Sequence, residues 1–180
     1  MNWPSKEDLD SIDMSGVLNR IPKEDDYAKY IPMQAGIEHY RLLVWLGYQF
    51  NKTSLVEVGV LKGMSGCALS ENIENKVTGF DLNNSITCTL PSNYTFIIGD
   101  VLLREDLIKN SPFIMYDTDH NGIHEKLFYD WLIKINYKGL LLFDDIHLNN
   151  EMRAFWNNII HKKEDISHIG HITGTGVVWM

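Results

Sequence analysis

Two acidic segments contain the residue types best suited to metal-ion or acid–base chemistry. Residues 117–120 read Asp-Thr-Asp-His, residues 144–147 read Asp-Asp-Ile-His, and each segment follows or ends a short apolar run. Ligands of open α/β sheets bind outside the carboxyl ends of the strands, so both segments are expected to face one crevice. Carboxylates crowded into one crevice repel each other unless a cation or bound protons relieve the repulsion.

The ligand types in these segments narrow the choice of cation. Oxygen ligands favour a hard ion such as Mg²⁺, whereas the nearby His120 and His147 leave room for Mn²⁺ or Fe²⁺. The alternative is that these acids cap separate helices and are neighbours by chance, because Asp is also preferred at helix N-termini. His124 is expected on the solvated side of the helix that follows the first segment.

A turn with two glycines is the second candidate site. Residues 57–65 read EVGVLKGMS, where a predicted strand ends and a predicted helix begins. Gly59 and Gly63 allow a tight turn and a close approach of the backbone to a ligand. The spacing is GxxxG, so the GxGxxG fingerprint is absent and a nicotinamide dehydrogenase is disfavoured. A purely structural turn is the alternative.

Two further acids end predicted strands on the same sheet edge. Asp81 lies 22 residues after Gly59, a place from which a carboxylate accepts hydrogen bonds from ribose hydroxyls. Asp100 ends the next strand and could receive an adenine amino group. The alternatives are a solvated carboxylate at Asp81 and a helix N-cap at Asp100.

Short apolar runs alternate with helical patterns along the chain, which is typical of βαβ units and a mostly parallel sheet. Helices are expected near residues 36–50, 64–72, 123–135 and 152–160, whereas the connection 83–93 is too short for more than one helical turn. Strands are expected at residues 54–60, 76–82, 94–100, 113–118 and 139–144, with two final strands at 166–172 and 174–180.

Length and composition bound the class of protein. The chain has 180 residues, a size that suits one domain, and a formal net charge of −8. No basic cluster is present, so a nucleic-acid substrate is disfavoured. Cys67 and Cys88 show no metal-binding spacing, and the sequence shows neither a signal peptide nor an apolar run of the ~20 residues that span a membrane. We expect a cytoplasmic protein.

Residues 1–35 are expected to form an N-terminal arm, which could act as a lid, ahead of a single domain at residues 36–180. Ser5 and Asp8 could cap a short helix in this arm. Four large side chains of the arm could cover a site, although such residues more often pack in a core: Trp3, Tyr27, Tyr30 and Met33.

The segments EVGVLKGMS, GFDL, IIGD, YDTDH and GLLLFDDIH together resemble the class I S-adenosylmethionine-dependent methyltransferases. More narrowly, they are similar to the metal-dependent O-methyltransferases of sugar and natural-product tailoring, and GTGVVWM resembles the last strand of that family. The resemblance covers residues 54–180. It implies a Rossmann-like α/β sheet, mostly parallel with an antiparallel last strand, flanked by helices.

The resemblance also implies three groups of site residues. S-adenosylmethionine would be bound at Glu57, Gly59, Gly63, Ser65, Asp81, Asp100 and Asp117. Within that group, Asp81 would hold the ribose and Asp100 would lie near the adenine. A divalent metal ion such as Mg²⁺ would be ligated by Asp117, Asp144 and Asp145. The general base would be Asp119 or His120.

The activity implied by the resemblance is metal-assisted O-methylation of a small hydroxylated molecule. The alternatives are a metal-independent methyltransferase with another acceptor, and a module that binds S-adenosylmethionine without turnover. The sequence lacks the inserts that commonly cover the acceptor in this family, and the connection 83–93 is shorter than usual. The acceptor site would therefore be completed by the N-terminal arm or by a second subunit of a homo-oligomer.

Overall fold

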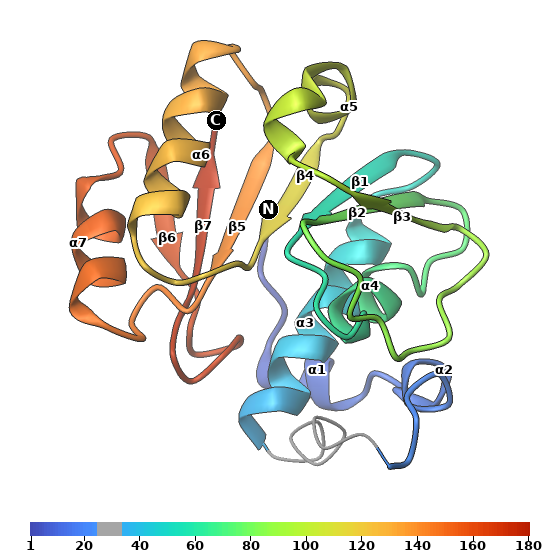
Figure 1. Cartoon of the computed structure of the whole chain (residues 1–180). Helices are drawn as coiled ribbons and strands as arrows, with labels where there is room; N and C mark the ends of the chain where they lie inside the picture. Colours follow the sequence, from blue (N-terminus) through green and yellow to red (C-terminus); the bar gives the residue numbers. More distant parts are fainter. Residues whose placement is uncertain (25–33) are drawn as a thin grey trace.

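Seven strands of the described residues form one sheet whose strand order reverses near its middle. The computed structural model describes residues 1–24 and 34–180, and only the backbone of residues 34–37. The order is β3-β2-β1-β4-β5-β7-β6, and β7 runs antiparallel to both of its neighbours (Figure 1). The mostly parallel sheet with an antiparallel last strand is confirmed. The strands are β1 (Ser54–Val58), β2 (Lys76–Asp81), β3 (Tyr94–Ile98), β4 (Phe113–Tyr116), β5 (Leu140–Asp144), β6 (Lys162–Asp165) and β7 (Thr175–Trp179).

Helices connect the strands where the chain is long enough. Ser5 caps the first helix through the reciprocal hydrogen bonds with Asp8 that the sequence predicts. The connection 83–93, which the structure describes throughout, contains no helix, as its length predicts. The described helices are α1 (Lys6–Asp10), α2 (Ser15–Leu18), α3 (Gln34–Gln49), α4 (Met64–Leu69), α5 (Glu105–Lys109), α6 (Ile123–Lys134), α7 (Asn150–Asn158) and the short 3-10 helix η2 (Val101–Leu103).

Alternating side chains along the central strands form two hydrophobic clusters, one on each face of the sheet. In β5, Leu140 and Leu142 belong to the cluster that α1, α2, α3 and α4 cover, whereas Leu141 and Phe143 belong to the cluster that α5, α6 and α7 cover (Figure 1). A central parallel strand is buried on both faces in this way. The packing fixes the strand ends from which the acidic segments emerge.

The described part of the N-terminal arm packs into the core. Trp3 contacts Trp45 and Trp179, with ring centroids 6.0 and 6.3 Å apart. Trp3 therefore has the packing role and does not cover a site. The other three candidates lie outside the residues whose side chains are described: Tyr27, Tyr30 and Met33.

Two predicted elements near the C-terminus differ from the structure. Residues 166–172 form a loop, and the penultimate strand is instead β6, whose sequence is Lys-Lys-Glu-Asp. This strand lies at the sheet edge, where charged side chains protect the unpaired backbone from other chains, so it carries no apolar signal. Helix α7 ends at Asn158, and Ile160, predicted on its apolar side, is 83% exposed.

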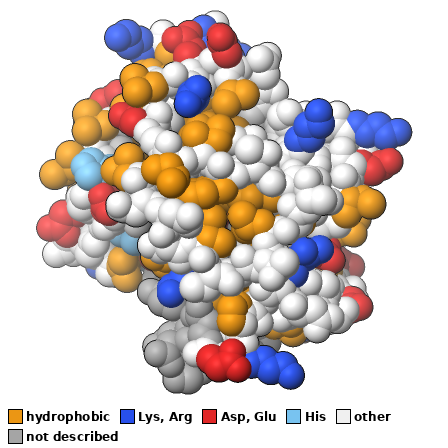
Figure 2. Space-filling model, turned by 45° about the vertical axis from the view of Figure 1, so that its right-hand side comes forward, with side chains coloured by type: hydrophobic (Ala, Val, Ile, Leu, Met, Phe, Trp, Pro, Cys, Tyr) orange, Lys and Arg blue, Asp and Glu red, His pale blue; other side chains and the backbone are white. Residues whose placement is uncertain are grey.

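The surface has the mixed charge that the composition predicts. On the face shown in Figure 2, Lys and Arg side chains of the described residues are scattered among acidic and hydrophobic ones. Within the described part of this face, positive charge is not gathered into the kind of patch that duplex nucleic acids bind. None of the helices in residues 1–24 and 34–180 is both long and apolar enough to cross a membrane.

Gly59→Ala is expected to destabilise the fold because the turn after β1 presses against the end of β4. Gly59 has a φ of +88°, and an added Cβ would lie 1.6 Å from the carbonyl oxygen of Asp117. The backbone must shift to relieve this clash. We expect the free energy of unfolding, measured by denaturant titration, to fall by about 2–4 kcal/mol.

Gly99→Ala is the matched control for this prediction. Its φ of +149° is also positive, but no heavy atom lies within 4 Å of the added Cβ. Only the backbone strain remains, and we expect a loss of about 1 kcal/mol. Equal losses in the two variants would contradict the close approach of the turn to β4.

Candidate active site

One large cavity lies at the carboxyl ends of the parallel strands, beside the β1–β4 pair where the strand order reverses. Its volume is about 1270 Å³, more than the roughly 300–1,000 Å³ of a typical small-molecule pocket. The sheet edge lines it with residues 58–62, 80–83, 99–102, 116–120, 144–145 and 171–173. The helices add His39, Tyr40, Met64, Ser65, His124, Leu127 and Phe128.

The turn after β1 is tied to Asp81 at the end of β2. Asp81 Oδ2 accepts hydrogen bonds from the backbone N–H groups of Val60 and Leu61, both at 3.0 Å, and Oδ1 accepts one from Asn83 at 3.1 Å. Burial alone would raise the pKa of Asp81, but these backbone donors outweigh it and lower the pKa. Asp81 thus lies in the cavity wall as a carboxylate, where the sequence predicts it.

Glu57 lies behind the cavity wall rather than in it. Its side chain is fully buried and accepts hydrogen bonds from the hydroxyl groups of Ser65 and Tyr94. We expected Glu57 to line the cofactor site, but the side chain points into the hydrophobic layer and acts through Ser65, which does line the cavity. Gly63 likewise does not line the cavity. It is the N-cap residue of α4 and has a φ of +89°.

Asp100 is an N-cap, one of the two roles that the sequence left open, and it also lines the cavity. Its side chain caps η2 by accepting a hydrogen bond from the Leu102 N–H at 2.9 Å. The same residue lines the cavity next to the end of β2, beside Asp81. The β2–β3 side of the cavity therefore carries two carboxylates.

The second acidic group lies on the β4–β5 side, where His120 separates Asp117 from Asp145. His120 Nε2 is 3.2 Å from Asp117 Oδ1 and 3.4 Å from Asp145 Oδ2. Burial lowers the pKa of His120, but the hydrogen bond that its ring donates to Asp117 and the charges of both aspartates outweigh burial and raise the pKa to about 9. At neutral pH the His120 ring therefore carries a proton and acts as a cation between the carboxylates.

Asp145 contacts a second histidine, which sequence reasoning missed. Asp145 Oδ1 lies 3.0 Å from His171 Nδ1 and accepts a hydrogen bond from the Thr173 hydroxyl. Burial would raise the pKa of Asp145, but these two partners outweigh it and lower the pKa. The hydrogen bond with Asp145 raises the pKa of His171. His171 lies in the loop 166–172 that was predicted as a strand, which is why its place in the site was not seen.

Asp144 and His39 are the most deeply buried polar residues of this group. They are 5% and 6% exposed, and Asp144 Oδ1 and His39 Nδ1 have no hydrogen-bond partner among the described residues. The two atoms lie 3.7 Å apart. Burial, followed by the charges of Asp117 and Asp145, raises the pKa of Asp144 well above its ordinary value. Burial lowers the pKa of His39 to about 4, so its ring is neutral.

These orphaned atoms test whether the site suits a cation. In the tautomer of His39 that carries its proton on Nε2, Nδ1 and the facing Asp144 Oδ1 are two acceptors without a donor, and a cation would satisfy both. The ligand atoms of Asp144, Asp145 and His171 also lie within 4.8 Å of one another. The donor set fits a metal ion. Asp117, which the resemblance placed among the ligands, is instead paired with His120.

The two candidates for the general base lie in different surroundings. Asp119 is at the cavity mouth with its side chain 63% exposed, and it pairs with His124 Nδ1 at 2.5 Å. His120 lies deeper and adopts a left-handed backbone with a φ of +52°. Buried Glu125 holds this loop, because its Oε1 accepts hydrogen bonds from the His120 N–H and the Thr118 hydroxyl.

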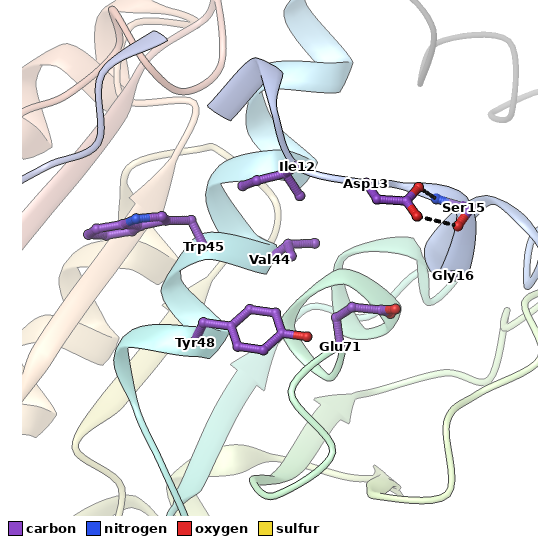
Figure 3. A pocket seen from close by; sticks show the side chains of 8 residues that line it. All are labelled: Ile12, Asp13, Ser15, Gly16, Val44, Trp45, Tyr48 and Glu71. Atoms are coloured by element: carbon purple, nitrogen blue, oxygen red, sulfur yellow. Dashed lines mark hydrogen bonds between the residues drawn. The ribbon is translucent and has the colours of Figure 1, made fainter. Parts of the chain in front are cut away.

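A second, smaller pocket of about 470 Å³ lies between α2, α3 and α4 (Figure 3). Its main acid, Asp13, already accepts hydrogen bonds from the N–H and the hydroxyl of Ser15. The side chains shown include no histidine and no group of converging carboxylates. We assign no chemistry to this pocket.

Glu57→Gln is expected to change the pH dependence of stability. Burial raises the pKa of Glu57 from an ordinary value of 4.5 to about 7, against the opposing effect of the Ser65 and Tyr94 hydroxyls. The folded state therefore binds this proton more tightly than the unfolded state, so stability falls as the pH rises from about 4.5 to about 7. Glu57→Gln removes the ionisable group, so this fall in the free energy of unfolding should shrink by up to about 3 kcal/mol. Denaturant titrations between about pH 5 and pH 8 measure it.

Glu151→Gln, at an exposed position in α7, is the control for Glu57→Gln. This variant should keep the pH dependence of the unchanged protein. If Glu57→Gln kept it too, Glu57 would not be protonated in the folded state.

The comparisons with known proteins agree on the fold. No family model matches the sequence, and no curated protein matches it. A candidate caffeoyl-CoA O-methyltransferase from Staphylococcus aureus is similar in structure, with a TM-score of 0.60 at 12% identity, covering 98% of this chain and 93% of that one. The methyltransferase PaMTH1 from Podospora anserina, solved with S-adenosylhomocysteine, has a TM-score of 0.59 at 10% identity, covering 100% and 99%.

A third similar structure is the O-methyltransferase TomG from Streptomyces achromogenes in complex with S-adenosylmethionine. Its TM-score is 0.58 at 12% identity, with 78% of each chain covered. The three structures align with most of this chain. The resemblance seen in the sequence motifs is therefore confirmed for the fold: this chain has the Rossmann-like fold of the class I methyltransferases.

Proposed function

We propose that this protein is an S-adenosylmethionine-dependent methyltransferase that methylates a hydroxyl group of a small molecule with the help of a divalent metal ion. One observation carries the proposal: a single cavity of about 1270 Å³ holds Asp81 and Asp100 at one side and Asp117, Asp144 and Asp145 at the other. Its volume suits a cofactor and a small acceptor side by side.

The β2–β3 side suits the nucleoside part of the cofactor. Asp81 is an ionised strand-end carboxylate and can accept hydrogen bonds from ribose hydroxyls. Asp100 lies beside it for the adenine, and Gly59 and Ser65 border the part of the cavity near β1. S-adenosylmethionine supplies an electrophilic methyl group when bound. PaMTH1 with S-adenosylhomocysteine and TomG with S-adenosylmethionine support this choice of cofactor.

The β4–β5 side suits the acceptor. Asp144 and Asp145 would hold the metal ion, which lowers the pKa of a hydroxyl group bound to it. Residues that line the cavity would orient that hydroxyl group. Much of the rate of methyl transfer comes from holding the hydroxyl oxygen at attack distance from the methyl group. Asp119, at the mouth of the cavity, is the proposed acceptor of the released proton. His120, the other candidate, is already protonated at neutral pH and would first have to give up that proton.

Two alternatives make different predictions. A metal-independent methyltransferase would keep its activity in a strong chelator. A module without turnover would bind S-adenosylhomocysteine but would methylate none of the acceptors tried. Neither alternative accounts for the unpaired buried atoms of His39 and Asp144 as directly as a metal site does.

Calorimetric titration with S-adenosylhomocysteine, followed by transfer of a labelled methyl group to a panel of catechols and sugars, tests the proposal. We expect micromolar binding and a transfer activity that a chelator abolishes and a divalent metal ion restores. Absence of binding would overturn the proposal, and transfer unaffected by the chelator would remove the metal ion from it.

Asp81→Asn is expected to weaken the binding of S-adenosylhomocysteine by roughly tenfold to a hundredfold, because hydrogen bonds to a charged acceptor contribute about 1.5–3 kcal/mol. The asparagine keeps one oxygen for the backbone N–H groups of the turn. Calorimetry measures the dissociation constant, and circular dichroism checks the fold.

Asp165→Asn is the matched control, since Asp165 also ends a strand and accepts a backbone hydrogen bond, from Ser167, but lies outside the cavity. Its affinity for S-adenosylhomocysteine should equal that of the unchanged protein. Equal affinities for all three proteins would remove Asp81 from the cofactor site.

A further inference from the structure

One imidazole nitrogen and two carboxylates converge at the end of β5. His171 Nδ1 lies 3.0 Å from Asp145 Oδ1 and 3.9 Å from Asp144 Oδ2. Ligand atoms of the three residues all lie within 4.8 Å of one another. The group therefore contains a nitrogen donor, His171 Nδ1, as well as carboxylate oxygens.

His39 adds an independent observation from the other side of Asp144. Its ring is 6% exposed, its Nδ1 has no hydrogen-bond partner in the described residues, and that atom faces the equally unpaired Asp144 Oδ1 at 3.7 Å. This distance is too long for a hydrogen bond. Bonds from a divalent transition-metal ion to nitrogen and oxygen are each about 2.0–2.2 Å long, so two of them span such a gap.

We infer that Asp144, Asp145, His171 and His39 form a mixed nitrogen–oxygen site for a divalent transition-metal ion. The inference deepens the metal part of the proposed function, on whose cavity it rests, by naming two histidine ligands. His39 comes from α3 and His171 from the loop before β7. The ion would therefore join α3 to the end of β5 and to that loop.

The two histidines decide the class of ion. Mg²⁺ prefers oxygen ligands and retains its water molecules, whereas imidazole nitrogen suits Fe²⁺, Co²⁺, Ni²⁺ and Zn²⁺. His39 Nδ1 has no hydrogen-bond partner among the described residues and lies 3.7 Å from Asp144 Oδ1, so this nitrogen is placed to ligate an ion. Asp117 stays outside the ligand set because it is not among the three residues whose ligand atoms lie within 4.8 Å of one another. The site should therefore bind Co²⁺, used as a probe, far more tightly than Mg²⁺.

Titration of the chelator-treated full-length chain with Co²⁺ tests this inference, because bound Co²⁺ absorbs visible light with an intensity that depends on its ligands. We expect one Co²⁺ per chain, and a Mg²⁺ affinity at least a hundredfold lower by calorimetry. His171→Gln and His39→Gln should each weaken Co²⁺ binding by roughly tenfold to a hundredfold and change the absorption spectrum.

His147→Gln is the matched control. His147 pairs with Asp165 at 2.7 Å as His171 pairs with Asp145, but it lies outside the cavity. It should leave Co²⁺ binding unchanged. Binding of S-adenosylhomocysteine, measured in every variant, reports an intact fold and separates failure of the metal site from failure of the proposed cofactor. His171 is partly exposed, so its variant serves even if His39→Gln does not fold.

Two results would overturn the inference. Co²⁺ binding that neither histidine variant alters would mean an oxygen-only site. No Co²⁺ binding by a chain that binds S-adenosylhomocysteine would remove the metal site, and the cofactor assignment would stand without it.

Discussion

Like charges at the ends of neighbouring parallel strands constrain the rest of the site. β4 and β5 pair with Tyr116 opposite Phe143, so Asp117 and Asp144 emerge side by side. Burial and the nearby carboxylates raise the pKa of Asp144 well above its ordinary value. The repulsion must be balanced from outside the two strands.

The balance comes from two histidines on separate loops, and a third histidine, whose ring is neutral, completes the group. His120 lies between Asp117 and Asp145, His171 contacts Asp145, and His39 faces Asp144. Carboxylate partners raise the pKa of both His120 and His171, which favours the positively charged form of each ring when no metal ion is bound. A metal ion would displace such protons, which makes metal binding dependent on pH.

The backbone is strained where these loops turn inward. His120 and Asp145 have φ values of +52° and +58°, a left-handed conformation that costs a side-chain-bearing residue about 1 kcal/mol or more. Asn149 offsets part of this cost by donating a hydrogen bond to the carbonyl oxygen of His120 at 2.7 Å while capping α7. The loops after β4 and β5 are thereby joined, and the carboxylates keep their spacing.

The sequence predicts the strands and their terminal acids well, because each strand carries a local apolar run followed by a turn. Asp81, Asp100, Asp117, Asp144 and Asp145 all line the cavity for that reason. Contacts between distant segments leave no such local signal. His39 lies in an apolar helical stripe, and His171 lies in a loop whose apolar residues imitate a strand. Glu57 has the strand-end position of a ligand residue, but only the packing of Tyr94 and Ser65 shows that it faces inward.

The order of the strands separates the two halves of the proposed reaction. Asp81 ends β2 and Asp144 ends β5, and β1 and β4 lie between these strands. Three strand spacings of about 4.8 Å give a separation of about 14 Å between a ribose at Asp81 and an ion at Asp144. The methionine part of S-adenosylmethionine would have to bridge this span across β1 and β4, past the turn at Gly59 that is pressed against the backbone of Asp117. A side chain at Gly59 would push against the end of β4 and displace Asp117, which lines the same cavity.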